Sequence, residues 1–257
     1  MPRPLVLLSN DDGYRAPGIR ILRDALREMF DVFVCAPETE QSATSHSLTL
    51  NRPMRLIDRG DGFASVDGTP ADSVYIALNS GTRVLPRAPD LVVAGLNHGV
   101  NLGTDVFYSG TVAAAREGAL RGYPSIAFSA ARDADMEAAA KVAVRIAAET
   151  LAEAPGRPLL LNVNFPSGSA WTLRQTRLGE RIYTDTVDFR RDPRGAEYLW
   201  LGGPGAEHRP NPGSDTDAFD AGEISVTPLV LDLFSPSESE LTARVVAGVT
   251  SVTGISS

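Results

Sequence analysis

The chain alternates short, continuously apolar runs with stretches in which apolar residues recur at the helical period. A run without polar positions is typical of a strand that a parallel sheet buries on both faces. After Pro17, the spacing of Ile19, Leu22, Leu26 and Met29 predicts an amphipathic helix. We expect strands at 5–8, 32–35, 91–94, 125–128 and 159–163, and further helices at about 71–78, 110–120 and 135–153.

This alternation predicts an α/β fold, a doubly wound, Rossmann-like arrangement with a mainly parallel sheet and right-handed crossovers. Beyond Pro166 the character changes, because helical periodicity is weak and turn residues such as Gly202–Gly205 are frequent. That pattern favours a β-rich region of hairpins or an arm that packs on another subunit. We therefore expect a core over residues 1–168 and an extension over 169–257, whose tail from Val245 is strand or coil.

Composition is that of an ordinary globular protein, with 43% hydrophobic and 22% charged residues among 257. A net charge of −8 argues against binding to a nucleic-acid duplex, which requires a basic face. The single cysteine, Cys35, excludes an intrachain disulfide and is expected to be a buried small hydrophobe. The apolar run 5–8 is too short for a signal peptide, and no run has the roughly 20 residues of a membrane helix. We predict a cytoplasmic protein without membrane contact.

The first predicted strand leads directly into an acidic turn, Asn10-Asp11-Asp12-Gly13. In open α/β sheets, ligands bind beyond the carboxyl ends of the strands. Two adjacent carboxylates repel each other unless a cation lies beside them. The alternative is a solvated turn stabilised by side-chain hydrogen bonds, but the position at a buried strand end favours metal. A metal-free nucleotide loop fits poorly, because no Gly-x-Gly-x-x-Gly pattern is present.

Two further loops follow predicted strands. Ser42 lies after the second strand and could give a hydroxyl oxygen to the same cation, although a loop serine is more often exposed. The loop over 95–108 is rich in glycine and asparagine, and long ordered loops are usually functional; the alternative is a surface insertion. Ser109 then suits a helix N-cap, and Gly110 permits close approach of an anion to the helix start. A plain capped helix is the simpler interpretation of that sequence.

These motifs together resemble the SurE family, the stationary-phase survival proteins. The resemblance covers residues 9 to about 228. The blocks that carry it are Asn10–Gly13, Ala16–Ile19, Pro37 with Gln41 and Ser42, Gly68–Asp72, Gly95–Asp105, Tyr108–Val112, Asn162–Pro166 and Ser214–Asp217.

The resemblance implies residue roles that agree with the reading of the loops. The implied metal ligands are Asp11, Asp12, Ser42 and Asn97, the implied phosphate-binding residues are Asn101, Ser109, Gly110 and Thr111, and the implied catalytic residues are Asp11, Asp12, Asn97 and Ser109. Because the metal ligands are oxygens, we expect one hard divalent cation per subunit, Mg²⁺ or Mn²⁺.

The resemblance also implies hydrolysis of nucleoside 5′- and 3′-monophosphates, polyphosphatase activity in some members, and a homodimer or homotetramer with exchanged C-terminal arms. Asp11 or Asp12 would orient or deprotonate the attacking water, or Asp11 would form a covalent phosphoryl intermediate. Either His46 or His98 could donate a proton to the leaving oxygen, although an ordinary polar loop residue is the more common role for each. His208 is expected to be exposed and structural.

Other interpretations stay open at this point. Asp215-Thr216-Asp217 could be a second metal motif, a loop over the substrate or a helix cap. Tyr108, Phe189, Tyr198 and Trp200 could stack on a base or serve packing. A metal-dependent nucleotide-sugar transferase and a non-catalytic nucleotide-binding or signalling protein are the competing functions.

Overall fold

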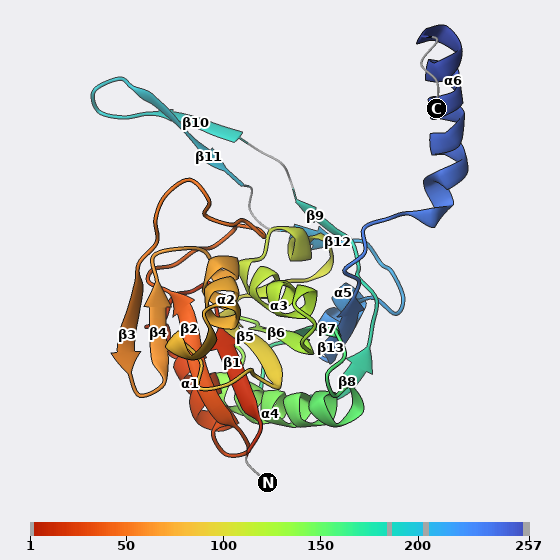
Figure 1. The fold of residues 1–257 in the computed structure, drawn as a ribbon. Helices are drawn as coiled ribbons and strands as arrows, with labels where there is room; N and C mark the ends of the chain where they lie inside the picture. Colours follow the sequence, from red (N-terminus) through yellow and green to blue (C-terminus); the bar gives the residue numbers. More distant parts are fainter. Residues whose placement is uncertain (1–2, 184–186, 203–205, 254–257) are drawn as a thin grey trace.

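The computed structural model describes residues 3–183, 187–202 and 206–253. Within these ranges, nine strands form one sheet in the order β3-β4-β2-β1-β5-β6-β7-β13-β8 (Figure 1). The strands from β4 to β7 all run parallel, whereas β3 and β13 are antiparallel to their neighbours β4 and β7. The sheet consists of β1 (Leu5–Ser9), β2 (Asp31–Pro37), β3 (Leu56–Gly60), β4 (Phe63–Val66), β5 (Leu91–His98), β6 (Ser125–Ala130), β7 (Leu160–Phe165), β8 (Leu173–Gln175) and β13 (Ile224–Leu229).

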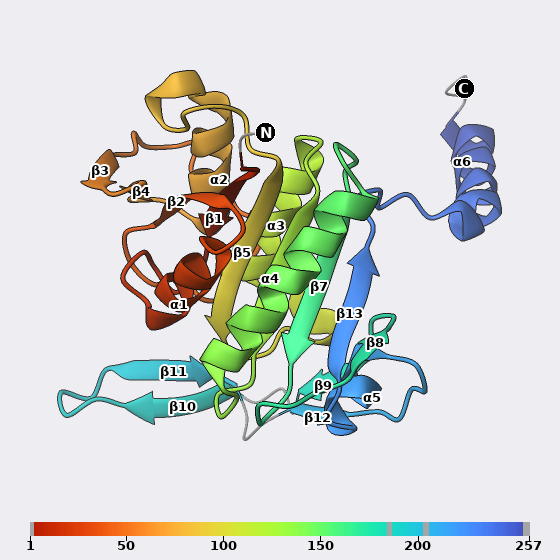
Figure 2. The ribbon, with the colours of Figure 1, turned by 90° about the horizontal axis from the view of Figure 1, so that it is seen from below.

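Helices cover both faces of the sheet, which confirms the doubly wound α/β fold. On β1, Val6 and Leu8 pack in a core with residues of α1 and α4, whereas Leu7 packs in a second core with residues of α2 and α3. Figure 2 shows α4 lying along the sheet on the first of these faces. The helices are α1 (Pro17–Leu26), α2 (Pro70–Asn79), α3 (Gly110–Leu120), α4 (Met136–Glu153), α5 (Asp215–Asp220) and α6 (Ser239–Thr253), with short 3-10 turns η1 (Gly81–Arg83), η2 (Gly103–Phe107) and η3 (Pro236–Glu238).

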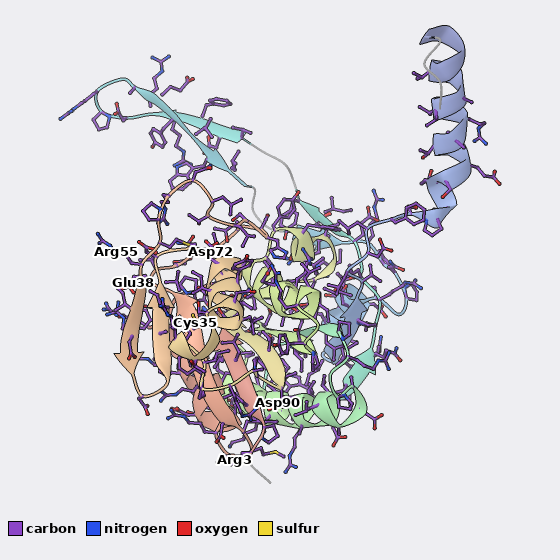
Figure 3. All side chains as sticks on the ribbon, viewed as in Figure 1. Arg3, Cys35, Glu38, Arg55, Asp72 and Asp90 are labelled. Atoms are coloured by element: carbon purple, nitrogen blue, oxygen red, sulfur yellow. The ribbon has the colours of Figure 1, made fainter. Side chains whose placement is uncertain are left out.

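Polar side chains fix the starts of α2, α3 and α4 close to the predicted positions. Thr69 and Asp72 form a reciprocal capping box at α2. Asp72 also accepts hydrogen bonds from the backbone N–H and hydroxyl of Thr49, at 2.9 and 2.6 Å, so it ties the preceding loop to the helix (Figure 3). Ser109 caps α3 and Asp135 caps α4.

Cys35 lies on β2 inside the molecule (Figure 3). Burial raises the pKa of its thiol to about 12. The thiol therefore stays neutral and packs as a small apolar group, as the sequence predicts.

The C-terminal extension begins as part of the main sheet, since β13 pairs with β7 and β8 pairs with β13. It also contains antiparallel hairpin pairings, as predicted. These are β10 (Val187–Arg191) with β11 (Glu197–Leu201), and β9 (Arg181–Tyr183) with β12 (Ala206–His208). The β10–β11 hairpin stands away from the body (Figure 1). The predicted turn residues Gly203–Gly205 lie outside the described residues.

The prediction of strand or coil for the tail is wrong. Residues from Ser239 to Thr253 form α6, which stands apart from the sheet in both views (Figures 1 and 2), and residues 254–257 lie outside the described ranges. Leu241, Val245 and Val249 recur every fourth residue and form one exposed apolar stripe. The valines favour strands by propensity, but their spacing is helical, and the spacing decides.

Candidate active site

The C-terminal ends of β1, β2 and β5 meet at one edge of the sheet because these strands are neighbours. The loops that follow them line a single cavity of about 690 Å³. Six of the predicted site residues line it directly, namely Asp11, Asp12, Ser42, Asn97, Asn101 and Ser109. The strand order thus brings together loops that lie far apart in the chain, since Asp12 and His98 are separated by 86 residues.

Asp11 is the buried member of the acidic pair, with 5% of its surface exposed. Burial raises the pKa of its carboxyl to about 6, against a hydrogen bond from the Thr111 hydroxyl that lowers it, and the charge of Asp12 adds to the rise. The main-chain carbonyl of Asp11 accepts a hydrogen bond from the Gln41 N–H at 2.7 Å, which holds the second loop against the first. A carboxylate so placed is costly unless a cation neutralises it.

Asp12 is partly exposed and lies beside a third carboxyl, that of Glu40. Burial raises the pKa of Asp12, a hydrogen bond from the His98 N–H lowers it, and the charge of Glu40 raises it further. Ser42 donates to Glu40 at 2.9 Å, so its hydroxyl oxygen keeps lone pairs for another partner. Acidic oxygens therefore gather on one side of the cavity.

The first turn of α3 lies directly against Asp11. A Cβ added to Gly110 would lie 2.7 Å from the Asp11 Cβ and 3.1 Å from the Pro70 Cγ, so only glycine fits between them. The hydroxyls at this helix start are engaged, since Ser109 accepts from the Val112 N–H at 3.1 Å and Thr111 donates to Asp11. The helix start offers an anion its backbone N–H groups and its positive dipole end.

The glycine- and asparagine-rich loop is ordered by buried hydrogen bonds. Asn101 donates its backbone N–H to Asn164 at 2.7 Å and its side-chain N–H to Ser129 at 2.8 Å. Its carbonyl accepts from Asn162 at 2.8 Å. Asn97 donates to the Gly99 carbonyl at 2.7 Å, which leaves its amide oxygen as the atom suited to a cation. The loop is thus fastened to β6 and β7, and Asn162 and Asn164 of the Asn162–Pro166 motif hold Asn101 in place.

The comparisons with known proteins agree on one family. The model of the family described as "Survival protein SurE" matches residues 6–185. The chain belongs to the SurE family. A protein from Sorangium cellulosum (strain So ce56) named 5'-nucleotidase SurE is 63% identical over 238 residues, which cover 91% of this chain and 92% of the relative. A relative of the same name from Anaeromyxobacter sp. (strain Fw109-5) is 50% identical over 88% of this chain and 90% of its own length.

A solved structure is also similar over most of its length. The crystal structure of the SurE protein from Aquifex aeolicus is 39% identical, has a TM-score of 0.79, and is matched over 94% of this chain and 99% of the other. The matches to the Sorangium cellulosum protein and to the Aquifex aeolicus structure therefore continue into the C-terminal extension, beyond residue 185, where the family-model match ends.

Of the two histidines considered as acids, only His98 lies in the cavity of this SurE-family chain. Its Nε2 is 3.3 Å from the Arg132 carbonyl oxygen. His46 instead lies along α3, with its Nε2 2.9 Å from the Glu117 Oε2. Burial would raise the pKa of Glu117, but hydrogen bonds from His46 and Arg121 outweigh it and hold the pKa below its ordinary value. His46 therefore fastens the Ser42 loop to α3. His208, expected to be exposed, is largely covered and bonds Asp220 at 3.1 Å.

Asp215 links the site to the extension. Its fully buried carboxylate accepts backbone N–H groups of Gly103, Gly179 and Thr216 at 2.8, 2.7 and 2.9 Å. Burial holds the pKa of the Asp215 carboxyl above its ordinary value, although these hydrogen bonds lower it in part. Ser214 caps α5 through the Asp217 N–H. These contacts give the second-metal interpretation of this motif no support, since both Asp215 carboxylate oxygens already accept backbone N–H groups.

The cavity also contains residues that sequence reasoning missed: Glu40, Asp105, Arg132, Arg181 and Tyr183. Asp105 accepts hydrogen bonds from Arg181 and Tyr183, which come from β9 of the extension. Their local sequence carries no motif, so the contact across 76 residues becomes visible only in the fold. Tyr108 lines the cavity, whereas Phe189, Tyr198 and Trp200 lie exposed on the β10–β11 hairpin.

Proposed function

We propose that the protein is a phosphomonoesterase that hydrolyses nucleoside 5′- and 3′-monophosphates with one bound Mg²⁺ or Mn²⁺ per subunit. The observation that carries the proposal is the buried Asp11 beside Asp12, facing the N-terminus of α3. One group of residues suits a cation and the adjoining helix start suits an anion. The names of the curated relatives, 5'-nucleotidase SurE, support the same reaction.

The residues present fit a hard divalent cation. Asp11, Asp12, Ser42 and Asn97 would hold it through oxygen atoms, with the Asn97 amide nitrogen turned to Gly99. The raised pKa of Asp11 and Asp12 also fits, because a cation would remove the cost of burying two like charges. When bound, the cation supplies Lewis-acid polarisation of the phosphoryl oxygens and a more acidic water.

The chain's own groups would bind and orient the substrate. The backbone N–H groups at Gly110 and Thr111 would receive the phosphoryl oxygens, with Ser109 and Asn101 shaping the cradle. Asp12, the more exposed acid, would orient the attacking water or take its proton. Direct attack by water is favoured over a covalent intermediate because Thr111 and Gly110 cover Asp11. Isolation of a phosphoryl adduct on Asp11 would contradict this route.

His98 lines the cavity, and we propose that it protonates the leaving oxygen. We expect His98→Gln to lower kcat by about 10²-fold, as loss of a general acid does. The matched control is His46→Gln, which should reduce stability through Glu117 and leave kcat within a few-fold. Equal losses of kcat in the two variants would contradict a role of His98 as the general acid.

The exposed apolar surfaces support a homodimer or homotetramer with exchanged arms. Phe189, Trp200 and Leu201 on the hairpin, and Leu241 and Val245 on α6, present large apolar side chains to solvent. Light scattering of the full chain should give a multiple of 27.3 kDa, reduced in the variants Trp200→Ser and Val245→Glu. An unchanged mass in both variants would reject these surfaces as the interface.

Location is part of the proposal. No described helix is long and apolar enough to cross a membrane. A cytoplasmic location agrees with a single, buried cysteine, which needs no oxidising compartment.

Orthophosphate release tests the proposed function. The purified chain would be assayed with 5′- and 3′-nucleoside monophosphates and polyphosphate, in Mg²⁺, Mn²⁺ or excess chelator. We expect phosphate release from the monophosphates, and we expect excess chelator to abolish it. Turnover of polyphosphate would show that the substrate range extends beyond monophosphates. Nucleotide binding without release under either metal would favour a binding protein instead.

A further inference from the structure

We infer that Arg181 of the C-terminal extension binds the substrate's phosphoryl group, so that the extension supplies a cationic wall of the catalytic cavity. This inference rests on the proposed phosphomonoesterase function and adds a residue to it. The side chain of Arg181 is 16% exposed and lines the same cavity as Asp11, Asp12 and Ser109.

Charge in the cavity makes a cationic group necessary. Its lining includes the carboxyls of Asp11, Asp12, Glu40 and Asp105. A bound divalent cation offsets only part of that charge, and a phosphate monoester brings about two negative charges of its own. Arg132 and Arg181 are the Lys or Arg residues in the described lining, and a guanidinium matches two phosphoryl oxygens at once.

Arg181 is held in position while part of its hydrogen-bonding capacity stays available. Its Nη1 donates to Asp105, which also accepts from the Tyr183 hydroxyl. Burial and that bond to Asp105 raise the pKa of Tyr183 to about 12, so the hydroxyl keeps its proton at neutral pH. The buried Arg181 Nε has no hydrogen-bond partner among the described residues. A guanidinium has five donor hydrogens, and Asp105 does not use them all.

The backbone that carries Arg181 is fastened to the cavity loop. Asp215 accepts the N–H groups of both Gly103 in that loop and Gly179 beside β9. Gly103 has a φ of +52°, and a Cβ there would lie 2.7 Å from the Gly179 carbonyl oxygen. The hydroxyl of Thr104 also approaches the Arg181 carbonyl oxygen at 3.5 Å. The guanidinium is therefore pre-positioned, as substrate-orienting groups must be.

Phosphate affinity tests the inference directly. We expect Arg181→Met to raise KM for adenosine 5′-monophosphate, KM for p-nitrophenyl phosphate and the inhibition constant of orthophosphate, each by about 10- to 100-fold. The matched control is Arg209→Met, since Arg209 is exposed and pairs with Glu180 outside the cavity; its three constants should stay within about two-fold of wild type. A rise for the nucleotide alone would overturn phosphoryl binding in favour of nucleoside recognition.

A double variant separates binding from folding. Arg181→Met leaves the buried Asp105 carboxylate without its cationic partner and with only the Tyr183 hydroxyl, which alone can distort the site. Asp105→Asn with Arg181→Met removes both charges, and we expect it to recover most of the lost thermal stability and keep the raised KM. If KM instead returns to the wild-type value, Arg181 serves only to hold Asp105 and the inference fails.

The closing measurement distinguishes this failure from failure of the proposed function. Orthophosphate binding to the Mn²⁺-loaded wild type and to both variants would be measured by calorimetry, which needs no turnover. If the wild type binds orthophosphate but hydrolyses nothing, the function fails and the loss of binding in Arg181→Met still supports the inference. Equal binding by wild type and variant overturns the inference whatever the wild type hydrolyses.

Discussion

The cavity has two walls, and the fold holds them by different means. Asp11 lies two residues beyond Ser9, whose strand pairs with β2 on one side and β5 on the other. Arg181 and Tyr183 lie on a three-residue strand paired with β12, and the carboxylates of Asp105 and Asp215 fasten that strand to the cavity loop. The core wall therefore depends on the whole sheet, whereas the extension wall depends on a few bonds that single substitutions can remove.

Asp11→Asn should give the largest effect, on the core wall. We expect kcat to fall by about 10³-fold or more, because a cation ligand and its charge are lost. Stability of the metal-free protein should not fall at neutral pH, since a neutral amide replaces a buried carboxyl and can still accept from Thr111. Steady-state kinetics and urea unfolding check both parts. Activity within ten-fold of wild type would contradict the assignment.

Asp215→Ala should break the extension wall. Three N–H groups, two of them buried and that of Gly179 partly buried, lose their acceptor, and we expect the free energy of unfolding to fall by about 3 kcal/mol. KM should rise more than kcat falls, because the loosened strand carries Arg181. Asp217→Ala is the control, since Asp217 is partly exposed and pairs with Arg174; its cost should be at most about 1 kcal/mol. Equal costs for the two variants would contradict the special role of Asp215.

Gly110→Ala should disturb the junction of helix start and acid. Its Cβ would lie 2.7 Å from that of Asp11, and a shift of about 1 Å in a reacting group can lower kcat by about 10²-fold. Gly248→Ala on α6 has no neighbour within 4 Å of the added Cβ and should leave kcat unchanged. An unaffected kcat in Gly110→Ala would show that Asp11 and the start of α3 can move apart without loss of catalysis.

The most gradual effect is a pH dependence of the stability of the metal-free protein. The folded pKa of Asp11, about 6, lies above the ordinary 3.8, so the folded state binds more protons in that window. Stability should therefore decline as pH rises from about 4 to 6, by at most about 3 kcal/mol. Urea unfolding in chelator at several pH values measures it. The decline should be shallower in Asp11→Asn, and an equal slope in that variant would point to Asp12 or Asp215 instead.

The core was predictable because each of its elements has a local signature. The runs that became β1 and β5 are buried on both faces and contain no polar break, and Ser109 caps α3 as predicted. The family resemblance brought the acidic pair and Asn97 together, and the structure places them at the C-terminal ends of the neighbouring strands β1 and β5. The predicted roles of these residues in metal and phosphate binding stay predictions until they are measured.

The extension was less predictable because its order comes from tertiary contacts. Arg181 meets Asp105 only after the chain has folded back over the cavity, and nothing near Arg181 in the sequence indicates that contact. The two loop histidines looked equivalent, yet the Ser42 loop runs along α3 and takes His46 to Glu117. In α6, strand-favouring valines obscured a four-residue repeat.

The fastening of the extension through Asp105 and Asp215 has an evolutionary consequence. Because two carboxylates fasten the β9 strand to the cavity loop, exposed positions near β9 and β12 that contact neither carboxylate can change without disturbing the acidic pair or the helix start. Substitutions there would then change which phosphate esters enter the cavity, while the acidic pair and the start of α3 stay the same. Chimeras that keep Asp105 and Asp215 would test whether substrate selection can be exchanged without loss of phosphoester hydrolysis.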